Sequence, residues 1–86
     1  MARYVLKYGG TSVADAKRLY AAARTMAALR REGHEVVAVL SAQGAATNAL
    51  IAKAREIDPD CGGRELDQLL STGETCSVSL CAMALH

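Results

Sequence analysis

Two β-forming segments on either side of one helical segment constrain the fold of this 86-residue chain more than any other feature. The first, residues 3–8, is rich in β-forming residues and ends at Gly9-Gly10, which predicts a strand followed by a tight loop. The second, residues 35–41, is a nearly continuous apolar run typical of a strand buried on both faces of a parallel sheet. The pattern predicts a βαβ unit and an α/β fold.

The segment between the two strands has helical periodicity. Ser12 followed three residues later by Asp15 resembles a capping box, which predicts that a helix begins there. Apolar residues then recur at the three- and four-residue spacing of one helix face. These residues are Ala16, Leu19, Tyr20, Ala23, Met26 and Ala27. Arg30 and Arg31 followed by Gly33 predict the end of the helix, because cations suit a last turn and glycine adopts the left-handed conformation.

The second half of the chain is predicted to be helical, with two interruptions. A polar loop over residues 41–48 leads into a short helix over residues 49–57, in which Thr47 or Asn48 could serve as the cap. Residues 64–70 look helical, residues 71–73 are expected to interrupt the helix, and a last helix is predicted from Glu74 onward. That helix remains apolar through Leu85, so we expect a chain cut within a larger domain.

Composition excludes several classes of protein. Hydrophobic residues make up 51% and charged residues 22% of the chain, which is typical of a folded protein. The formal charge is +1 and neither sign forms a block, which argues against a nucleic-acid or membrane-surface partner. The longest aliphatic stretch is too short to span a bilayer and no signal-peptide pattern is present, so a cytoplasmic protein is expected.

Cysteine and histidine positions predict neither disulfides nor a metal site. Cys61, Cys76 and Cys81 are odd in number and form no CxxC pair, so they are expected to be free thiols. His34 and His86 have no second ligand at a metal-binding spacing. Candidate binding and catalytic residues are therefore sought in other segments.

The loop after the first strand has the features of a phosphate-binding loop. Ligands of open α/β sheets lie at the carboxyl ends of the strands. Gly9 and Gly10 let backbone N–H groups approach an anion, the following helix contributes a partial positive charge, and Lys7 supplies an ammonium group. A turn that requires glycine, next to a surface lysine, explains the same residues without a ligand.

Two further segments place polar groups near that edge. Residues 41–48 offer hydroxyl and amide groups to a small polar ligand, although such residues are also ordinary in loops and caps. Ser71 and Glu74 fit a capping box at a helix start. A carboxylate at Glu74 could also accept hydrogen bonds from a substrate ammonium group.

Taken together, three motifs carry a resemblance to a known family. Residues 7–12 read K-Y-G-G-T-S, and residues 37–42 read V-A-V-L-S-A and precede Gly44 and Thr47-Asn48. Residues 64–74 read R-E-L-D-Q-L-L-S-T-G-E. In this order and spacing they closely resemble the start of an aspartate kinase of the amino-acid kinase family, and the resemblance runs through all 86 residues.

The resemblance implies a fold, a reaction and a set of roles. The fold is a three-layer αβα sandwich, and the reaction is ATP-dependent phosphorylation of the side-chain carboxylate of L-aspartate, the first step toward lysine, threonine and methionine. Mg²⁺ accompanies the nucleotide. By the same resemblance Lys7 is catalytic, and two sets of residues would contact the two substrates. ATP phosphates would be contacted by Lys7, Tyr8, Gly9 and Gly10, and aspartate by Ser41, Thr47 and Glu74.

The resemblance also implies what surrounds this segment. Residues 1–86 would form the N-terminal portion of the catalytic domain, without the regulatory ACT domains, and a homo-oligomeric parent protein is expected. Because much of the ligand shell lies outside it, the segment alone is expected to be inactive as a kinase. The second loop departs from the family's common S-A-M-G-x-T-T-D, since Gln43, Ala46 and Asn48 replace Met, Thr and Asp.

Two alternative functions remain open at this level. A related amino-acid kinase that acts on another carboxylate or on carbamate would share the glycine loop, although the S-T-G-E segment argues against it. A non-catalytic phosphate-binding α/β remnant is the alternative from a different class.

Overall fold

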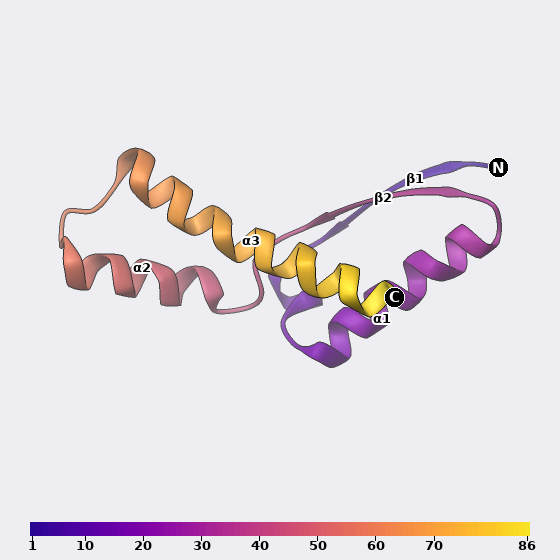
Figure 1. The fold of residues 1–86 in the computed structure, drawn as a ribbon, viewed down its shortest axis with the longest axis horizontal. Helices are drawn as coiled ribbons and strands as arrows, with labels where there is room; N and C mark the ends of the chain where they lie inside the picture. Colours follow the sequence, from indigo (N-terminus) through magenta and orange to yellow (C-terminus); the bar gives the residue numbers. More distant parts are fainter.

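The computed structural model describes all residues, 1–86, as a two-stranded sheet with helices (Figure 1). The elements in chain order are strand β1 (Arg3–Tyr8), the short 3₁₀ helix η1 (Gly10–Val13), helix α1 (Ala16–Arg31), strand β2 (Glu35–Leu40), helix α2 (Ala46–Ile57) and helix α3 (Gly63–Leu85). The two strands are parallel, with Arg3 opposite Glu35 and Tyr8 opposite Leu40. The predicted βαβ unit and α/β fold are confirmed.

Helix α1 begins at a different cap from the predicted one. Asp15, not Ser12, is the N-cap, and its side chain accepts a hydrogen bond of 2.9 Å from the Arg18 N–H. Ser12 lies one element earlier, inside η1, which is why it cannot cap α1. The predicted end is confirmed, because Gly33 follows the helix with a φ of +89° that favours glycine.

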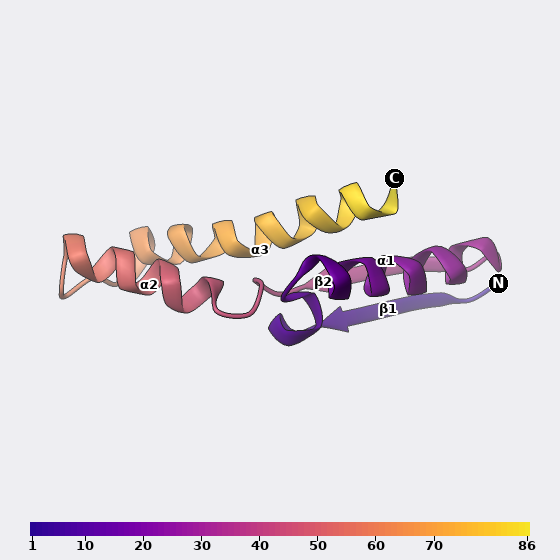
Figure 2. The same cartoon turned by 90° about the horizontal axis from the view of Figure 1, so that it is seen from below.

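The core lies on one face of the sheet. Five buried residues form it: Val13, Leu19, Ala22, Met26 and Cys81, which come from η1, α1 and α3. Leu6 and Tyr8 of β1 and Val36 and Leu40 of β2 pack against this cluster. Helices α1 and α3 therefore cover the same side of the strands, as Figure 2 also shows.

The other face of the sheet is exposed, contrary to the prediction that the second strand is buried on both faces. The side chains of Val37 and Val39 are 50% and 48% exposed, and Val5 on the neighbouring strand is 68% exposed. Side chains alternate between the faces of a strand, so these residues lie opposite the core. Residues 1–86 thus form a two-stranded sheet covered by one helical layer, on one face only.

Helix α2 and the N-terminal part of α3 pack together as an arm that extends beyond the sheet, in a molecule measuring 50 × 24 × 18 Å (Figure 1). Helix α2 begins at Ala46 rather than at the predicted residue 49, and neither Thr47 nor Asn48 caps it, because both lie in its first turn. No helix of the structure combines the length and apolarity needed to cross a membrane.

The predicted interruption at residues 71–73 is wrong, because α3 is continuous. The Ser71 and Thr72 hydroxyl groups donate hydrogen bonds of 2.7 and 2.6 Å to the carbonyl oxygens of Gln68 and Leu69 one turn earlier, so the helix accommodates them. Gly73 serves packing, since a Cβ there would lie 3.0 Å from the Cβ of Ala42. Ser71 is therefore not a cap, and Glu74 lies in mid-helix rather than in a first turn.

The three cysteines are free thiols, as predicted, and they differ in burial. Cys76 is exposed, whereas Cys81 is 3% exposed and packs against Met26, with 3.9 Å between the two sulfur atoms. Burial raises the pKa of the Cys81 thiol. The fold therefore favours the neutral thiol.

That raised pKa predicts a loss of stability at alkaline pH. A thiol whose folded-state pKa exceeds its unfolded value ionises first in the unfolded chain, so the free energy of unfolding falls as pH rises through the ordinary thiol range. Urea titrations between about pH 7 and 9.5 should show this decline. It should persist in Cys76→Ala and become shallower in Cys81→Ala, which keeps only the contribution of the buried Tyr8 phenol at the alkaline end. An equal slope in Cys81→Ala would contradict the assignment.

Candidate active site

The glycine loop leaves the sheet at the carboxyl end of β1. Gly9 continues the extended backbone of the strand, with φ −76° and ψ 174°, and its carbonyl oxygen accepts a 3.1 Å hydrogen bond from the Ser12 N–H. Val13, at the end of η1, is fully buried and anchors the loop to the core. The chain thus turns immediately beyond the sheet edge.

Two backbone hydrogen bonds join this loop to the loop that follows β2. The Ser41 N–H donates to the Tyr8 carbonyl oxygen at 3.1 Å, and the Gly44 N–H donates to that of Gly10 at 3.0 Å. A Cβ at Gly10 would lie 3.0 Å from the carbonyl oxygen of Ala42, so glycine permits the close approach. The structure therefore brings the first two predicted site segments together.

Gln43 adds a side-chain link between the same loops that sequence reasoning missed. Its Nε2 donates a 3.0 Å, partly buried hydrogen bond to the Val13 carbonyl oxygen. From the sequence alone, Gln43 stands out only because it replaces the Met of the pattern S-A-M-G-x-T-T-D. An amide in a polar loop gives no signal of its partner 30 residues earlier.

The third segment reaches the site through the packing of α3 on the second loop. Gly73 lies against Ala42, and this contact places the next turn of the helix beside the end of β2. A pocket of about 410 Å³ lies there between strand and helix. It is lined by Ala38, Val39, Leu40, Ser71, Glu74, Thr75 and Val78.

Lys7 lies on the open face of the sheet, next to the last residue of β1. It is exposed and is the register partner of Val39, so the two side chains share the face opposite the core. Thr47 lies farther along, half-buried in the first turn of α2. The carboxyl edge of the sheet therefore carries a cation from β1, hydroxyl groups that follow β2, and a carboxylate from α3.

These polar side chains have no partner within the chain. The side chains of Lys7, Ser41, Thr47 and Glu74 form no hydrogen bond and no ion pair. In contrast, the hydroxyl groups along α3 donate to helix carbonyl oxygens. The four groups lie on the segments that reach the carboxyl edge of the sheet, where α/β folds bind ligands.

Tyr8 differs from the other predicted site residues. Its side chain packs on the core face, and burial together with the nearby Cys81 raises the pKa of its phenol. The side chain is therefore neutral and directed away from Lys7, which is on the opposite face of the strand. On the open face, Tyr8 can contact a ligand only through its main-chain atoms.

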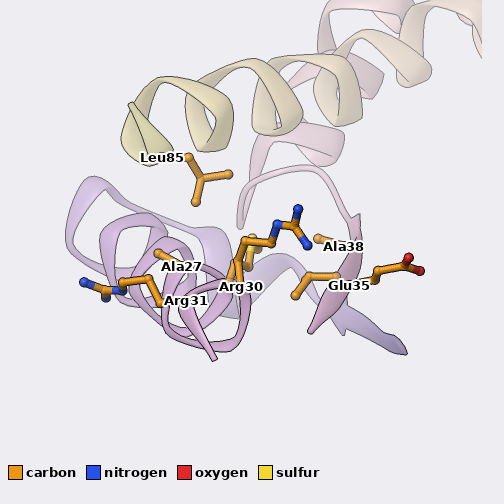
Figure 3. Close-up of a pocket in the computed structure, with 8 residues that line it drawn as sticks. Ala27, Arg30, Arg31, Glu35, Ala38 and Leu85 are labelled. Atoms are coloured by element: carbon orange, nitrogen blue, oxygen red, sulfur yellow. The ribbon is translucent and has the colours of Figure 1, made fainter. Parts of the chain in front are cut away.

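A larger pocket, of about 770 Å³, lies at the other end of the sheet, between α1, β2 and the last turn of α3 (Figure 3). Two of its three charged side chains, Arg30 and Glu35, have partners elsewhere. Arg30 Nη1 donates to the His34 carbonyl oxygen at 3.2 Å, and Glu35 Oε2 accepts from Arg3 Nε at 2.7 Å. Figure 3 shows the charged ends of Arg31 and Glu35 pointing outward in opposite directions. This pocket offers no convergent set of reactive groups.

Comparison with known proteins decides the family. Residues 2–86 match the model of the amino acid kinase family. The chain belongs to the amino acid kinase family. Within this amino acid kinase family, the chain is 47% identical over 85 residues to an aspartokinase of Thermus thermophilus and 46% identical over 86 residues to one of Mycobacterium tuberculosis. It is 42% identical over 86 residues to aspartokinase 2 of Bacillus subtilis.

These amino acid kinase relatives are much longer than the chain. The matches cover 99%, 100% and 100% of this chain but 21%, 20% and 21% of the three relatives, respectively. The chain thus spans about a fifth of their length. The crystal structure of an aspartate kinase from Synechocystis superposes with a TM-score of 0.91 and 40% identity, over 99% of this chain and 14% of that one.

Proposed function

We propose that this chain contributes to an aspartate kinase, which transfers the γ-phosphoryl group of ATP to the side-chain carboxylate of L-aspartate and forms 4-phospho-L-aspartate. Residues 1–86 then form the N-terminal portion of the catalytic domain. The aspartokinase relatives support this assignment. The observation that carries it is the set of unpaired polar side chains, from Lys7 to Glu74, at the carboxyl edge of the sheet.

The glycine loop suits the phosphate groups of ATP. A Cβ built on Gly9 would meet no atom within 4 Å, and its φ of −76° is open to any residue. The fold therefore does not itself require glycine there, whereas an anion approaching the backbone does. In the proposed complex the Lys7 ammonium neutralises phosphate oxygens, and the main chain of Tyr8, Gly9 and Gly10 lies against them.

The other end of the site suits the amino acid. Ser41 and Thr47 offer hydroxyl groups, and the Glu74 carboxylate offers acceptors to an α-ammonium group. With acceptor and donor substrates held side by side, the reaction is an in-line transfer that needs positioning and charge neutralisation but no covalent enzyme intermediate. Mg²⁺ bound to the nucleotide would add positive charge at the phosphates.

The two glycines of the loop are expected to respond differently to alanine. Gly10→Ala pushes a Cβ against the Ala42 carbonyl oxygen at 3.0 Å and should lower the free energy of unfolding by about 1–3 kcal/mol. Gly9→Ala has room and should change it by less than about 0.5 kcal/mol, while weakening ATP binding. Urea unfolding and nucleotide titration measure both effects. Equal stability losses in the two variants would contradict this division of roles.

The proposal extends to the cellular setting. A kinase of aspartate would act in the cytoplasm, at the start of lysine, threonine and methionine biosynthesis, as a homo-oligomer. These assignments rest on the proposed aspartate kinase activity.

A substrate panel tests the proposed reaction against its alternatives. The protein expressed from its complete reading frame is mixed with ATP and Mg²⁺, and ADP release is followed with L-aspartate, L-glutamate, N-acetyl-L-glutamate or carbamate. Release that depends on L-aspartate supports the proposal. Release with another acceptor favours a related kinase, and nucleotide binding without release favours a non-catalytic phosphate-binding module.

A further inference from the structure

The pocket between β2 and α3 holds two hydroxyl groups that have no role in the proposed function. Ser71, Glu74 and Thr75 all line this pocket of about 410 Å³. Their spacing of three and four residues places them on one face of the continuous helix α3. Sequence reasoning missed Thr75 and treated Ser71 as a cap, because it placed a helix break at residues 71–73.

The hydroxyl protons of both residues are already engaged within the helix. Ser71 Oγ donates to the Gln68 carbonyl oxygen at 2.7 Å, and Thr75 Oγ1 donates to the Ser71 carbonyl oxygen at 3.1 Å. A hydroxyl group has one proton and two lone pairs, so each oxygen retains only acceptor capacity. An ionised Glu74 is also an acceptor only. The polar side chains of the pocket therefore accept hydrogen bonds and donate none.

The charge and the walls of the pocket restrict the ligand further. No Lys, Arg or His lines it, and Glu74 has no ion-pair partner in the chain. The remaining lining residues, Ala38, Val39, Leu40 and Val78, are aliphatic and add no polar side-chain group to compete for the ligand. A cation that only donates hydrogen bonds fits these surroundings, whereas an anion does not.

We propose that Ser71 and Thr75 complete, with Glu74, a three-acceptor site for the primary ammonium group of the substrate. A primary ammonium group carries three N–H donors and no acceptor, which matches the three side chains in number and in kind. The inference rests on the proposed function, in which Glu74 binds the substrate ammonium group. Ser71 and Thr75 then accept the two N–H donors that would otherwise bind water. Ser71 and Thr75 thereby select amino acids over analogues without an amino group.

The test compares L-aspartate with succinate, which has both carboxylates but no amino group. Calorimetric titration of the protein from its complete reading frame should give a Kd for L-aspartate that rises roughly tenfold in Ser71→Ala and in Thr75→Val, because each loses a hydrogen bond to a charged group. The Kd for succinate should not change. Ser71→Thr, which keeps the hydroxyl group, should restore L-aspartate binding.

Ser79→Ala is the matched control. The Ser79 hydroxyl donates to the Thr75 carbonyl oxygen at 3.0 Å, as the other two donate one turn earlier, but it does not line the pocket. This variant should bind both ligands as the wild type does. If the wild type binds L-aspartate and the Ser71 and Thr75 variants bind it equally well, this inference alone is overturned. The same holds if those variants lose L-aspartate and succinate binding in parallel. Wild-type protein that binds no L-aspartate overturns the proposed function as well.

Discussion

Replacing Lys7 with alanine is expected to lower kcat of the proposed kinase reaction by about 100- to 1000-fold, the range for loss of one group that stabilises developing charge. Lys7 is exposed, forms no ion pair and lies at the carboxyl end of β1, and the proposed function makes it the cation of the site. Its removal leaves two anionic reactants without that charge. Because the side chain supports no contact of the core, the free energy of unfolding should not change.

The control for this variant is Lys53→Ala. Lys53 is an exposed lysine on α2, so it tests the loss of a surface charge without the loss of the site. Steady-state kinetics at saturating ATP and L-aspartate measure both variants, and Lys53→Ala should match the wild type. Turnover by Lys7→Ala within a factor of two of the wild type would remove Lys7 from the reaction.

Replacing Glu74 with glutamine is expected to raise the KM for L-aspartate by roughly 10- to 100-fold, as loss of a charge-assisted hydrogen bond predicts. The amide keeps the size of the side chain but loses the charge that attracts the α-ammonium group. The KM for ATP should remain close to that of the wild type, since Glu74 lies on α3 and not on the glycine loop. The variant should fold normally because Glu74 is exposed.

Glu56→Gln provides the matched control, because Glu56 is an exposed glutamate near the end of α2. Initial rates at varied L-aspartate and fixed ATP distinguish the two variants. An unchanged KM for L-aspartate in Glu74→Gln would leave Glu74 as an ordinary exposed helix residue, since the structure excludes a capping role.

The sequence predicts the parts of the fold that depend on local signals. The bounds of β1 and the end of α1 at Gly33 follow from β-forming residues and from glycine, whose effects act within a few residues. The start of α1 is predicted to within a turn, but the wrong side chain of the Ser12 and Asp15 pair is assigned as the cap. Both serine and aspartate are good caps, and the intervening η1 is what decides between them.

The sequence does not predict features that depend on distant contacts. Ser-Thr-Gly at residues 71–73 indicates a break on local propensity, yet the packing of Gly73 on Ala42 and hydrogen bonds to the preceding turn keep α3 continuous. The link from Gln43 to Val13 depends likewise on two loops that the sheet brings together. For the candidate site, the motifs identify the segments, whereas only the structure shows that Thr75 shares the pocket of Glu74.

Direct trapping of the reaction product tests the central claim, that this chain belongs to an enzyme that phosphorylates the side-chain carboxylate of L-aspartate. Acyl phosphates react with hydroxylamine to give hydroxamates and inorganic phosphate, so the protein from its complete reading frame is incubated with ATP, Mg²⁺, L-aspartate and hydroxylamine. The account predicts aspartyl 4-hydroxamate in amounts equal to the ADP released, none without L-aspartate, and a yield lowered by about 100- to 1000-fold with Lys7→Ala. ADP release without the hydroxamate, or an equal yield with another carboxylate in place of L-aspartate, would contradict it.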